Sequence, residues 1–235
     1  MFKEKKILCV IPCRSGSKGL PGKNIKMLLG RPLMVYSIEQ ARKSRYVDRV
    51  VVSTDDPRIA KIAVRAGAEA PFLRPKPIST DKSSVIDALL HAIAALKEKE
   101  GAVFDAIVLL HANAPLRNIG DIDKCIELLF TAGTENVFSV TPAQRNPYFN
   151  MVEIGRNSRV KLVKKGNFNN RQDAPSVFDL NSSIYAWKTE VLTRKRKVIL
   201  GGSKIYIMPK ERSVDIDDYL DFKLAELLMR KARKR

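Results

Sequence analysis

The stretch ILCVIPCRSGSKGLPGKN, residues 7–24, joins a short apolar run to a turn that is rich in glycine and positive charge. The apolar run is typical of a buried strand. The turn carries Arg14, Lys18 and Lys23 among three glycines. Glycine lets backbone amides approach phosphate oxygens, and basic side chains neutralise phosphate charge. The turn matches neither the Walker A motif nor GxGxxG, so it indicates another kind of phosphate-binding loop, with a basic surface loop as the alternative.

Beyond this stretch, apolar runs alternate with segments of helical period. Strand patterns at 49–56, 104–111 and 136–142 alternate with helix patterns at 32–44, 57–67, 83–101 and 120–133. Two further strands, 182–187 and 204–209, precede a closing helix at 217–235. This order predicts an α/β fold, with a parallel sheet covered by helices on both faces.

The alternation lapses between about residues 142 and 180. This stretch contains a possible hairpin, formed by YFNMVEI (148–154) and RVKLVKK (159–165) around the turn GRNS. It is too long for a simple connection, and too rich in β-branched and aromatic residues for a linker. We therefore expect an insertion at 142–180 that leaves the main sheet, within a single domain spanning residues 1–235.

The charge balance favours an anionic partner. The chain has 235 residues and a formal net charge of +18, from 43 lysines and arginines against 25 acidic residues. Phosphorylated small molecules or nucleic acid would suit this balance. The sequence contains no zinc finger, RNP-like aromatic motif or recognition-helix pattern, so a nucleic-acid role would rest on charge alone.

The same composition predicts a cytoplasmic protein. No apolar stretch approaches the roughly 18 residues of a membrane span, and the first apolar run is too short for a signal peptide. Cys9, Cys13 and Cys125 form an odd set without metal-ligand spacing. Reduced thiols are expected in the cytoplasm.

Two aspartates, Asp215 and Asp217, lie in SVDID ahead of the closing helix. In an extended segment, side chains at i and i+2 point to the same side, so both carboxylates could face one hard cation such as Mg²⁺. Asp217 could instead be the N-cap of the helix. His111 ends the run AIVLLH, a position that suits either a pocket residue or an ordinary hydrogen bonder.

The opening stretch resembles the N-terminal signature of the CMP-sialic acid synthetase (acylneuraminate cytidylyltransferase) family, whose form is close to IPARxGSKGxxxKN. Later blocks are similar to family blocks in the same order: DRVVVSTDD, FLRP, APLR, RQDAP, LNSSIYAW and RSVDIDDYLDFKLAE. The resemblance covers essentially the whole chain. It implies a Rossmann-like nucleotidyltransferase core with a mainly parallel sheet. It also implies transfer of CMP from CTP to the anomeric hydroxyl of a sialic-acid-like 2-keto sugar acid, with release of pyrophosphate.

The resemblance implies roles for the residues that match the nucleotide motifs. Arg14, Lys18 and Lys23 would hold the triphosphate of CTP, with Lys23 nearest the α-phosphate. Asn24 would meet the ribose. Arg74, in FLRP, would contact the cytosine, although an arginine between prolines could also be a surface residue.

The resemblance also favours the metal interpretation of Asp215 and Asp217, which would bind Mg²⁺ and complete the catalytic set with Arg14 and Lys23. No other cofactor is implied.

Three matching positions lie near the sugar acid in the family: His111, Arg171 in RQDAP and Asn181 in LNSSIY. The family's insertion swaps across a homodimer, which would carry Arg171 of this chain toward the partner's site. The expected partners are therefore CTP, a sugar acid and a second copy of the chain, and neither a membrane nor a nucleic acid is expected.

Three departures from the family lie on the sugar side. His111 stands where the family has a glutamine, Phe149 where well-known members have a lysine, and Ser182 where a glycine is usual. The sequence therefore supports CTP as the nucleotide more strongly than N-acetylneuraminate as the acceptor. A legionaminic or pseudaminic acid remains an alternative acceptor. The alternatives are a nucleotidyltransferase for a KDO-like acid or a sugar phosphate, and a basic nucleic-acid-binding protein.

Overall fold

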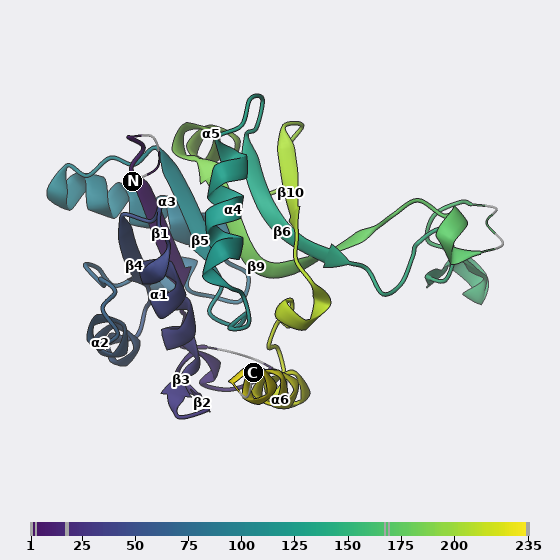
Figure 1. Cartoon of the computed structure of the whole chain (residues 1–235), viewed down its shortest axis with the longest axis horizontal. Helices are drawn as coiled ribbons and strands as arrows, with labels where there is room; N and C mark the ends of the chain where they lie inside the picture. The colour runs from purple at the N-terminus through teal and green to yellow at the C-terminus, as the bar shows by residue number, and fades with distance from the viewer. Residues whose placement is uncertain (1, 3, 17–18, 167, 169, 234–235) are drawn as a thin grey trace.

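A six-stranded sheet forms the centre of the molecule in the computed structural model, which describes residues 2, 4–16, 19–166, 168 and 170–233 (Figure 1). Across the sheet the strands are β10 (Ser203–Ile207), β6 (Asn136–Pro142), β9 (Phe178–Lys188), β5 (Ala106–Leu110), β1 (Ile7–Pro12) and β4 (Arg49–Ser53). β1 pairs in parallel with β4 and β5, and β10 pairs in parallel with β6. β9 runs antiparallel to both of its neighbours. The sheet is therefore mainly parallel, as the sequence predicted, with one inserted antiparallel strand.

Helices cover both faces of this sheet. They are α1 (Leu33–Lys43), α2 (Pro57–Arg65), α3 (Val85–Glu100), α4 (Ile119–Leu129) and α5 (Thr189–Lys195). A further helix, α6 (Tyr219–Arg233), follows β10. Side chains alternate along a strand, so Ile7 and Cys9 pack with α1, α2 and α4, while Leu8 and Val10 pack with α3 and α5. In the described part of the chain, no helix combines the length and apolar character that a membrane crossing needs.

The closing helix α6 packs against the opening loop instead of the sheet. Phe222 and Ala225 of α6 join Leu20 and Leu28 in a small third core. A two-stranded ribbon, β2 (Met27–Leu28) and β3 (Arg31–Pro32), lies beside it. This core joins the loop that follows β1 to the C-terminal helix, below the carboxyl ends of β1 and β5 (Figure 1).

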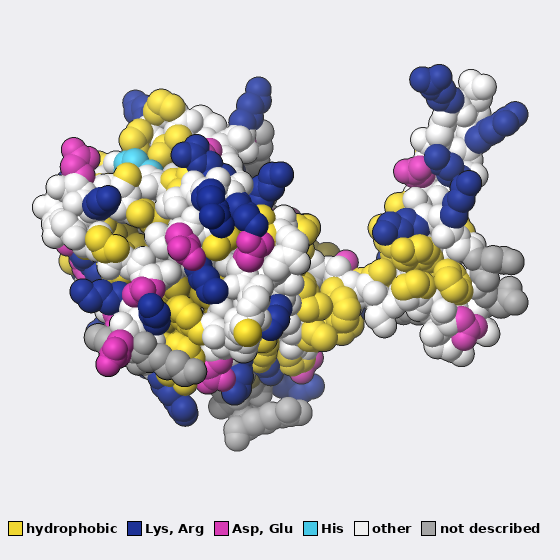
Figure 2. Space-filling model, turned by 90° about the horizontal axis from the view of Figure 1, so that it is seen from above, with side chains coloured by type: hydrophobic (Ala, Val, Ile, Leu, Met, Phe, Trp, Pro, Cys, Tyr) yellow, Lys and Arg dark blue, Asp and Glu magenta, His cyan; other side chains and the backbone are white. Residues whose placement is uncertain are grey.

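The expected insertion projects from the body of the molecule as an arm, here residues 143–177 between β6 and β9 (Figure 1). Its outer part contains the hairpin of β7 (Val152–Ile154) and β8 (Val160–Leu162). The space-filling view shows the arm as a lobe on a narrow neck, with apolar side chains gathered on it (Figure 2). The exposed apolar residues of the arm are Met151, Val152, Ile154, Val160 and Val163.

Candidate active site

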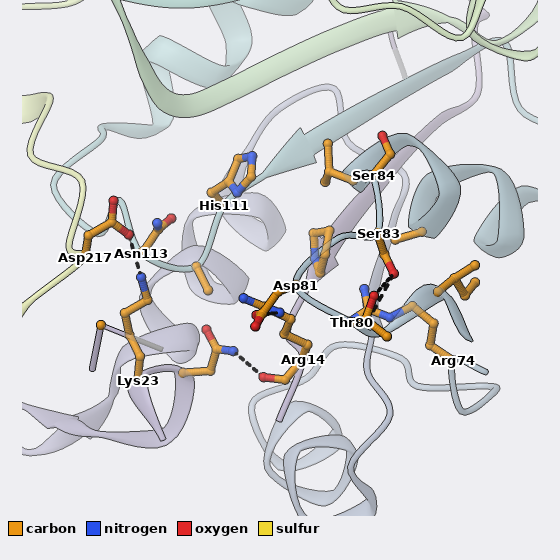
Figure 3. Close-up of a pocket in the computed structure, with 17 residues that line it drawn as sticks. Arg14, Lys23, Arg74, Thr80, Asp81, Ser83, Ser84, His111, Asn113 and Asp217 are labelled. Atoms are coloured by element: carbon orange, nitrogen blue, oxygen red, sulfur yellow. Dashed lines mark hydrogen bonds and ion pairs between the residues drawn. The ribbon is translucent and has the colours of Figure 1, made fainter. Parts of the chain in front are cut away.

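A cavity of about 450 Å³ opens at the carboxyl ends of β1 and β5 (Figure 3). Pro12 ends β1 in its wall, and His111 directly follows β5. The other charged and polar lining residues are Arg14, Lys23, Asn24, Arg74, Thr80, Asp81, Ser83, Ser84, Asn113 and Asp217. Residues from four distant parts of the sequence thus converge at the edge of a parallel sheet where α/β proteins bind ligands.

The glycine-rich loop is anchored at both ends. Ser15 donates two hydrogen bonds to Asp55, from its amide at 2.9 Å and from its hydroxyl at 2.6 Å. The Asn24 side chain donates to the carbonyl of Arg14 at 2.9 Å. Gly22, in the left-handed conformation with φ of 65°, turns the chain into the short helix that begins at Lys23. Lys18 lies outside the described residues.

Two of the predicted phosphate-binding cations meet in the cavity, each facing an aspartate. Arg14 pairs with Asp81, which lies on the loop before α3. The ammonium group of Lys23 lies 2.9 Å from Asp217 and 2.5 Å from the carbonyl of Ile216. The Lys23 side chain is only 12% exposed. An anionic ligand would meet two preplaced cations, whose carboxylate partners it would have to displace.

Arg74 is also in the cavity wall and is buried, with 5% of its surface exposed. Its Nε donates to the Ser79 hydroxyl at 3.0 Å. Burial lowers the pKa of the guanidinium, and the nearby charge of Asp55 opposes that effect. The surface alternative for Arg74 is therefore wrong, while its contact with a base stays a prediction.

His111 stands at the cavity floor as a neutral imidazole. Burial lowers its pKa to about 4, with the positive charges of Arg117 and Lys23 as lesser causes. Tyr185 lies edge-on to the ring, with 5.8 Å between centroids. At neutral pH His111 can donate or accept a hydrogen bond, but it is a weak base.

Arg117 is a site-supporting residue to which sequence reasoning assigned no role, although APLR was among the matched blocks. Its guanidinium is buried and donates to the carbonyl of His111, to Ser183 at 3.0 Å and to Ser37 at 2.9 Å. These contacts tie the end of β5 to α1 and β9. Its pKa falls to about 10 because of burial.

The segment that carries Asp215 and Asp217 lies against the glycine-rich loop. A Cβ built on Gly19 would come within 2.3 Å of the Asp217 carbonyl, so only glycine permits this approach. The backbone amide of Ile216 donates a hydrogen bond to the carbonyl of Asn113 at 2.9 Å. Residues that are about 200 positions apart in the chain therefore form one wall of the cavity.

Asp215 and Asp217 differ in environment. Burial raises the pKa of Asp215 to about 6, and the charge of Asp217 raises it further, while the Ser182 hydroxyl opposes the shift. Asp215 Oδ1 is buried and finds no hydrogen-bond partner among the described residues. The Asp217 side chain is 75% exposed. Within the described ranges, no group of three or more His, Cys, Asp or Glu side chains gathers as metal ligands.

Asp218, and not Asp217, caps the closing helix. Asp218 accepts a hydrogen bond from the amide of Asp221 at 2.9 Å, and Asp221 accepts one from the amide of Asp218 at 3.1 Å. This reciprocal pair caps α6. Asp217 lies one residue before this cap, and its carboxylate is free of the capping role.

Of the remaining predicted sugar-side residues, Asn181 and Phe149 are not among those that line this cavity, and the side chain of Arg171 lies outside the described part of the structure. Asn181 is buried and uses its amide within the protein, accepting from Ser139 at 2.7 Å and donating to Ser213 at 3.0 Å. Arg171 and Phe149 lie on the arm, away from the cavity of their own chain. The sugar contacts proposed for these residues stay predictions.

Sequence reasoning missed Asp81 and the hydroxyl-rich wall formed by Thr80, Ser83 and Ser84. The only signal was the polar run STDKSS at residues 79–84, which is also ordinary for a loop before a helix. Asn113 was missed too, although it lies two residues beyond His111 in the cavity floor (Figure 3).

Comparisons with known proteins agree on one family. A family model described as cytidylyltransferase matches residues 8–230. CMP-N,N'-diacetyllegionaminic acid synthase of Campylobacter jejuni is 38% identical over 95% of this chain and 94% of its own length. N-acylneuraminate cytidylyltransferase of Escherichia coli is 30% identical over 97% of this chain and 53% of its own length.

A solved structure supports the fold. CMP:2-keto-3-deoxy-manno-octonic acid synthetase complexed with CTP superposes with a TM-score of 0.71, at 18% identity, and covers 97% of this chain and 99% of that chain. Together these matches confirm the resemblance that the sequence motifs indicated.

Proposed function

We propose that this chain, which belongs to the cytidylyltransferase family, transfers CMP from CTP to the anomeric hydroxyl of a nine-carbon 2-keto sugar acid, with an acid of the legionaminic type as its preferred acceptor. The observation that carries the proposal is the convergence of Arg14, Lys23 and Asp217 in one cavity at the carboxyl ends of β1 and β5. In the reaction, the anomeric oxygen bonds to the α-phosphorus and the bond to the leaving pyrophosphate breaks.

The chain's own residues supply binding and charge. Arg14 and Lys23 exchange their carboxylate partners for phosphate oxygens, with Lys23 nearest the α-phosphate. Fixed positive charge in the cavity stabilises the negative charge that develops in transfer. Lys18 in the same loop would add a third cation. Arg74 and Asn24 hold the base and the ribose.

The acidic residues fit a magnesium ion. Asp215 presents a buried oxygen without a partner, and Asp217 is exposed at the cavity wall. Mg²⁺ favours one or two carboxylates together with phosphate oxygens and water, so two aspartates are a sufficient protein contribution. Bound there, the ion would neutralise charge on the triphosphate and on the leaving group. The protein's part is to hold both carboxylates in place.

The acceptor preference rests on two observations. Identity is 38% to the legionaminic relative and 30% to the N-acylneuraminate relative. His111 replaces the glutamine usual in the family, and its neutral ring beside Tyr185 offers less hydrogen bonding than an amide. Both favour an acid in which deoxy carbons and amides replace hydroxyls. Arg171 would pair with the acid's carboxylate, and Asn181 would lie near the sugar.

We further propose that the chain works as a homodimer, in which the arm of each protomer lies over the partner's cavity and contributes Arg171. The exposed apolar side chains of the arm need such a cover. A cytoplasmic location suits the three cysteines, which are buried free thiols.

The test is pyrophosphate release from CTP and Mg²⁺ with a panel of acids: N,N'-diacetyllegionaminic, pseudaminic, N-acetylneuraminic and 3-deoxy-manno-octulosonic acid. We expect kcat/KM for the legionaminic acid to exceed that for N-acetylneuraminate by at least about tenfold, the scale of one contact of ~1.4 kcal/mol. ATP, GTP and UTP are the nucleotide controls. Equal release from all four nucleotides would refute the cytidylyltransferase proposal, and equal turnover of the nine-carbon acids would refute only the acceptor preference.

A further inference from the structure

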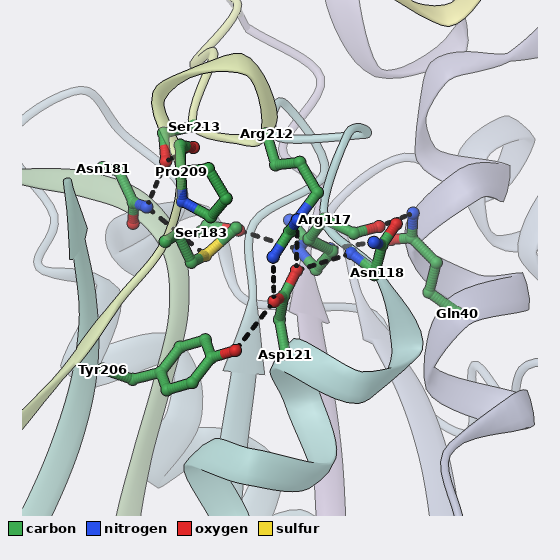
Figure 4. Close-up of polar contacts among 11 residues, drawn as sticks. Gln40, Arg117, Asn118, Asp121, Asn181, Ser183, Tyr206, Pro209, Arg212 and Ser213 are labelled. Carbon is green, nitrogen blue, oxygen red and sulfur yellow. Dashed lines mark hydrogen bonds and ion pairs between the residues drawn. The ribbon is translucent and has the colours of Figure 1, made fainter. Parts of the chain in front are cut away.

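The segment 209–217 carries both aspartates of the site but has little regular structure of its own. It connects β10 to α6, and its one short helical turn is Lys210–Arg212. Something other than secondary structure must therefore hold Asp215 and Asp217 in place. Figure 4 shows where this segment meets the rest of the protein.

One attachment is an ion pair between Arg212 and Asp121 of α4. Arg212 donates from Nε to Asp121 Oδ2 at 3.1 Å and from Nη2 to Oδ1 at 2.8 Å. The Asp121 side chain is 2% exposed and that of Arg212 is 28% exposed. Two parallel bonds between a guanidinium and a carboxylate define an orientation as well as a distance.

Asp121 is itself held rigidly. It accepts a hydrogen bond from the Tyr206 hydroxyl at 3.0 Å and from the Asn118 amide at 2.7 Å. The second contact is part of the capping box of α4. The carboxylate is thus fixed to a helix terminus and to β10, so that Arg212 docks on a rigid acceptor.

A second anchor lies one residue further along. Ser213 accepts a hydrogen bond from Asn181 of β9 at 3.0 Å and donates to the Pro209 carbonyl at 2.8 Å. From there the chain runs two residues to Asp215, and Ile216 bonds to Asn113 at the cavity floor. The two anchors therefore stand immediately before the aspartates.

We propose that Arg212, docked on Asp121, is a positioning residue that fixes the segment carrying Asp215 and Asp217 beside the cavity. The role in catalysis rests on the proposed function above. Without the pair, residues 213–217 would lose one of their anchors, and the two carboxylates would be held less firmly in the orientation that binds a cation. Arg212 itself is not among the residues that line the cavity.

The experiment compares Arg212→Met and Arg212→Lys with the wild type. The first readout is amide hydrogen exchange of residues 213–217, which needs no substrate. The second is binding of Mn²⁺, followed by electron paramagnetic resonance, in the presence of CTP without acceptor. We expect Arg212→Met to speed exchange at Ile216 and to weaken Mn²⁺ binding about tenfold, the size of effect common for residues that orient metal ligands. Arg212→Lys, which keeps a single donor, should lie between.

The matched control is Arg49→Met. Arg49 makes a similar multidentate pair, with Glu69 and Glu100, on the edge strand β4, and its side chain is 20% exposed. Arg49→Met should lower the unfolding temperature about as much as Arg212→Met does, without changing amide exchange at residues 213–217 or Mn²⁺ binding. If Arg212→Met matches Arg49→Met in both readouts, the positioning role is refuted. Faster exchange in Arg212→Met, in a protein that activates no sugar acid, would support the anchoring and refute the proposed function.

Discussion

At the scale of single residues, the run DIDD (215–218) shows how position in space gives identical aspartates different roles. Asp218 caps α6, while Asp217 faces Lys23 at the cavity wall and Asp215 turns into the protein. The difference follows from where the helix begins. The first backbone amides of a helix have no partner within it, and only the residue directly before the helix is placed to accept their hydrogen bonds. Asp215 and Asp217, which precede the cap, are thereby available for other chemistry.

Asp217→Asn is expected to lower kcat at least about tenfold, the effect of ~1.4 kcal/mol lost from the transition state, with little change in unfolding temperature. The amide keeps the shape but removes one charge from the cavity. Asp218→Ala should do the reverse, costing about 0.5–2 kcal/mol of stability as a lost cap while turnover persists. Steady-state kinetics and thermal unfolding of both variants check this. Near-normal turnover of Asp217→Asn at saturating Mg²⁺ would contradict it.

A second residue-scale prediction concerns acid stability. The folded-state pKa of His111 is about 4, below its ordinary 6.5, because burial disfavours the imidazolium. The unfolded chain therefore binds a proton between these values while the folded chain does not, and stability falls as the pH drops from 6.5 toward 4. His111→Gln should flatten this part of the profile.

Urea unfolding of wild type and His111→Gln across this pH range tests the prediction. The second histidine, His91, also has a pKa lowered by burial, but it is present in both proteins and cancels in the difference. If both proteins lose stability in parallel, His111 does not carry the effect.

At the scale of elements, the site depends on the contact between the glycine-rich loop and the segment before α6. Neither has regular structure over most of its length, and each supplies part of the wall that holds the other. The loop presents the cations and the segment presents the carboxylates. The loop and the segment can approach closely because Gly19 has no Cβ between them.

Gly19→Ala is expected to raise KM for CTP about tenfold or more, equivalent to ~1.4 kcal/mol of lost binding. The new methyl group would lie 2.3 Å from the Asp217 carbonyl, so that the loop or the segment must move. Gly16→Ala is the control, since a Cβ there meets no described atom within 4 Å and its φ is not positive. Equal KM values for the two variants would show that the close contact is unimportant for nucleotide binding.

At the scale of the whole molecule, the arm is the feature that a single chain does not explain. It carries exposed apolar side chains on a narrow neck, with Ile154 76% exposed and Val160 65% exposed. Surfaces of this kind mark interfaces more often than they face water. The sugar-side residue Arg171 is on the same arm, so that assembly and acceptor binding are expected to depend on each other.

Ile154→Asp is therefore expected to convert a homodimer to monomers and to reduce activity, because a buried charge at the interface opposes association. Light scattering at micromolar concentration gives the mass. Val103→Asp is the control, since Val103 is 66% exposed on the body of the molecule. A wild-type chain that is monomeric and fully active would contradict the assembly.

Complementation tests the shared site directly. Co-expression of Asp217→Asn with Arg171→Ala should restore roughly a quarter of wild-type activity, since half of the randomly formed dimers are mixed and each has one intact site. Each variant alone should be weak. No recovery in the mixture would mean that Arg171 does not act across the dimer.

Much of the fold could be predicted from local pattern. The strands and helices, the hairpin on the insertion and the carboxyl-edge position of the glycine-rich loop all follow from periodicity and turn chemistry over short windows. The charges of Arg14, Lys23, Asp215 and Asp217 also predicted an anion site and a metal site, and the binding of both ligands stays a prediction. These signals are local because each depends on neighbours within a few residues.

What only the tertiary structure decided depends on partners far apart in the chain. The direction of β9 between β5 and β6 could not be predicted, because the alternation of side chains is the same in parallel and antiparallel strands. Arg212 meets Asp121 across 91 positions, and Gly19 meets Asp217 across the length of the chain. Sequence alone therefore determined which chemical groups this protein has available, while packing decided which of them act together, since distance and burial set their charge and orientation.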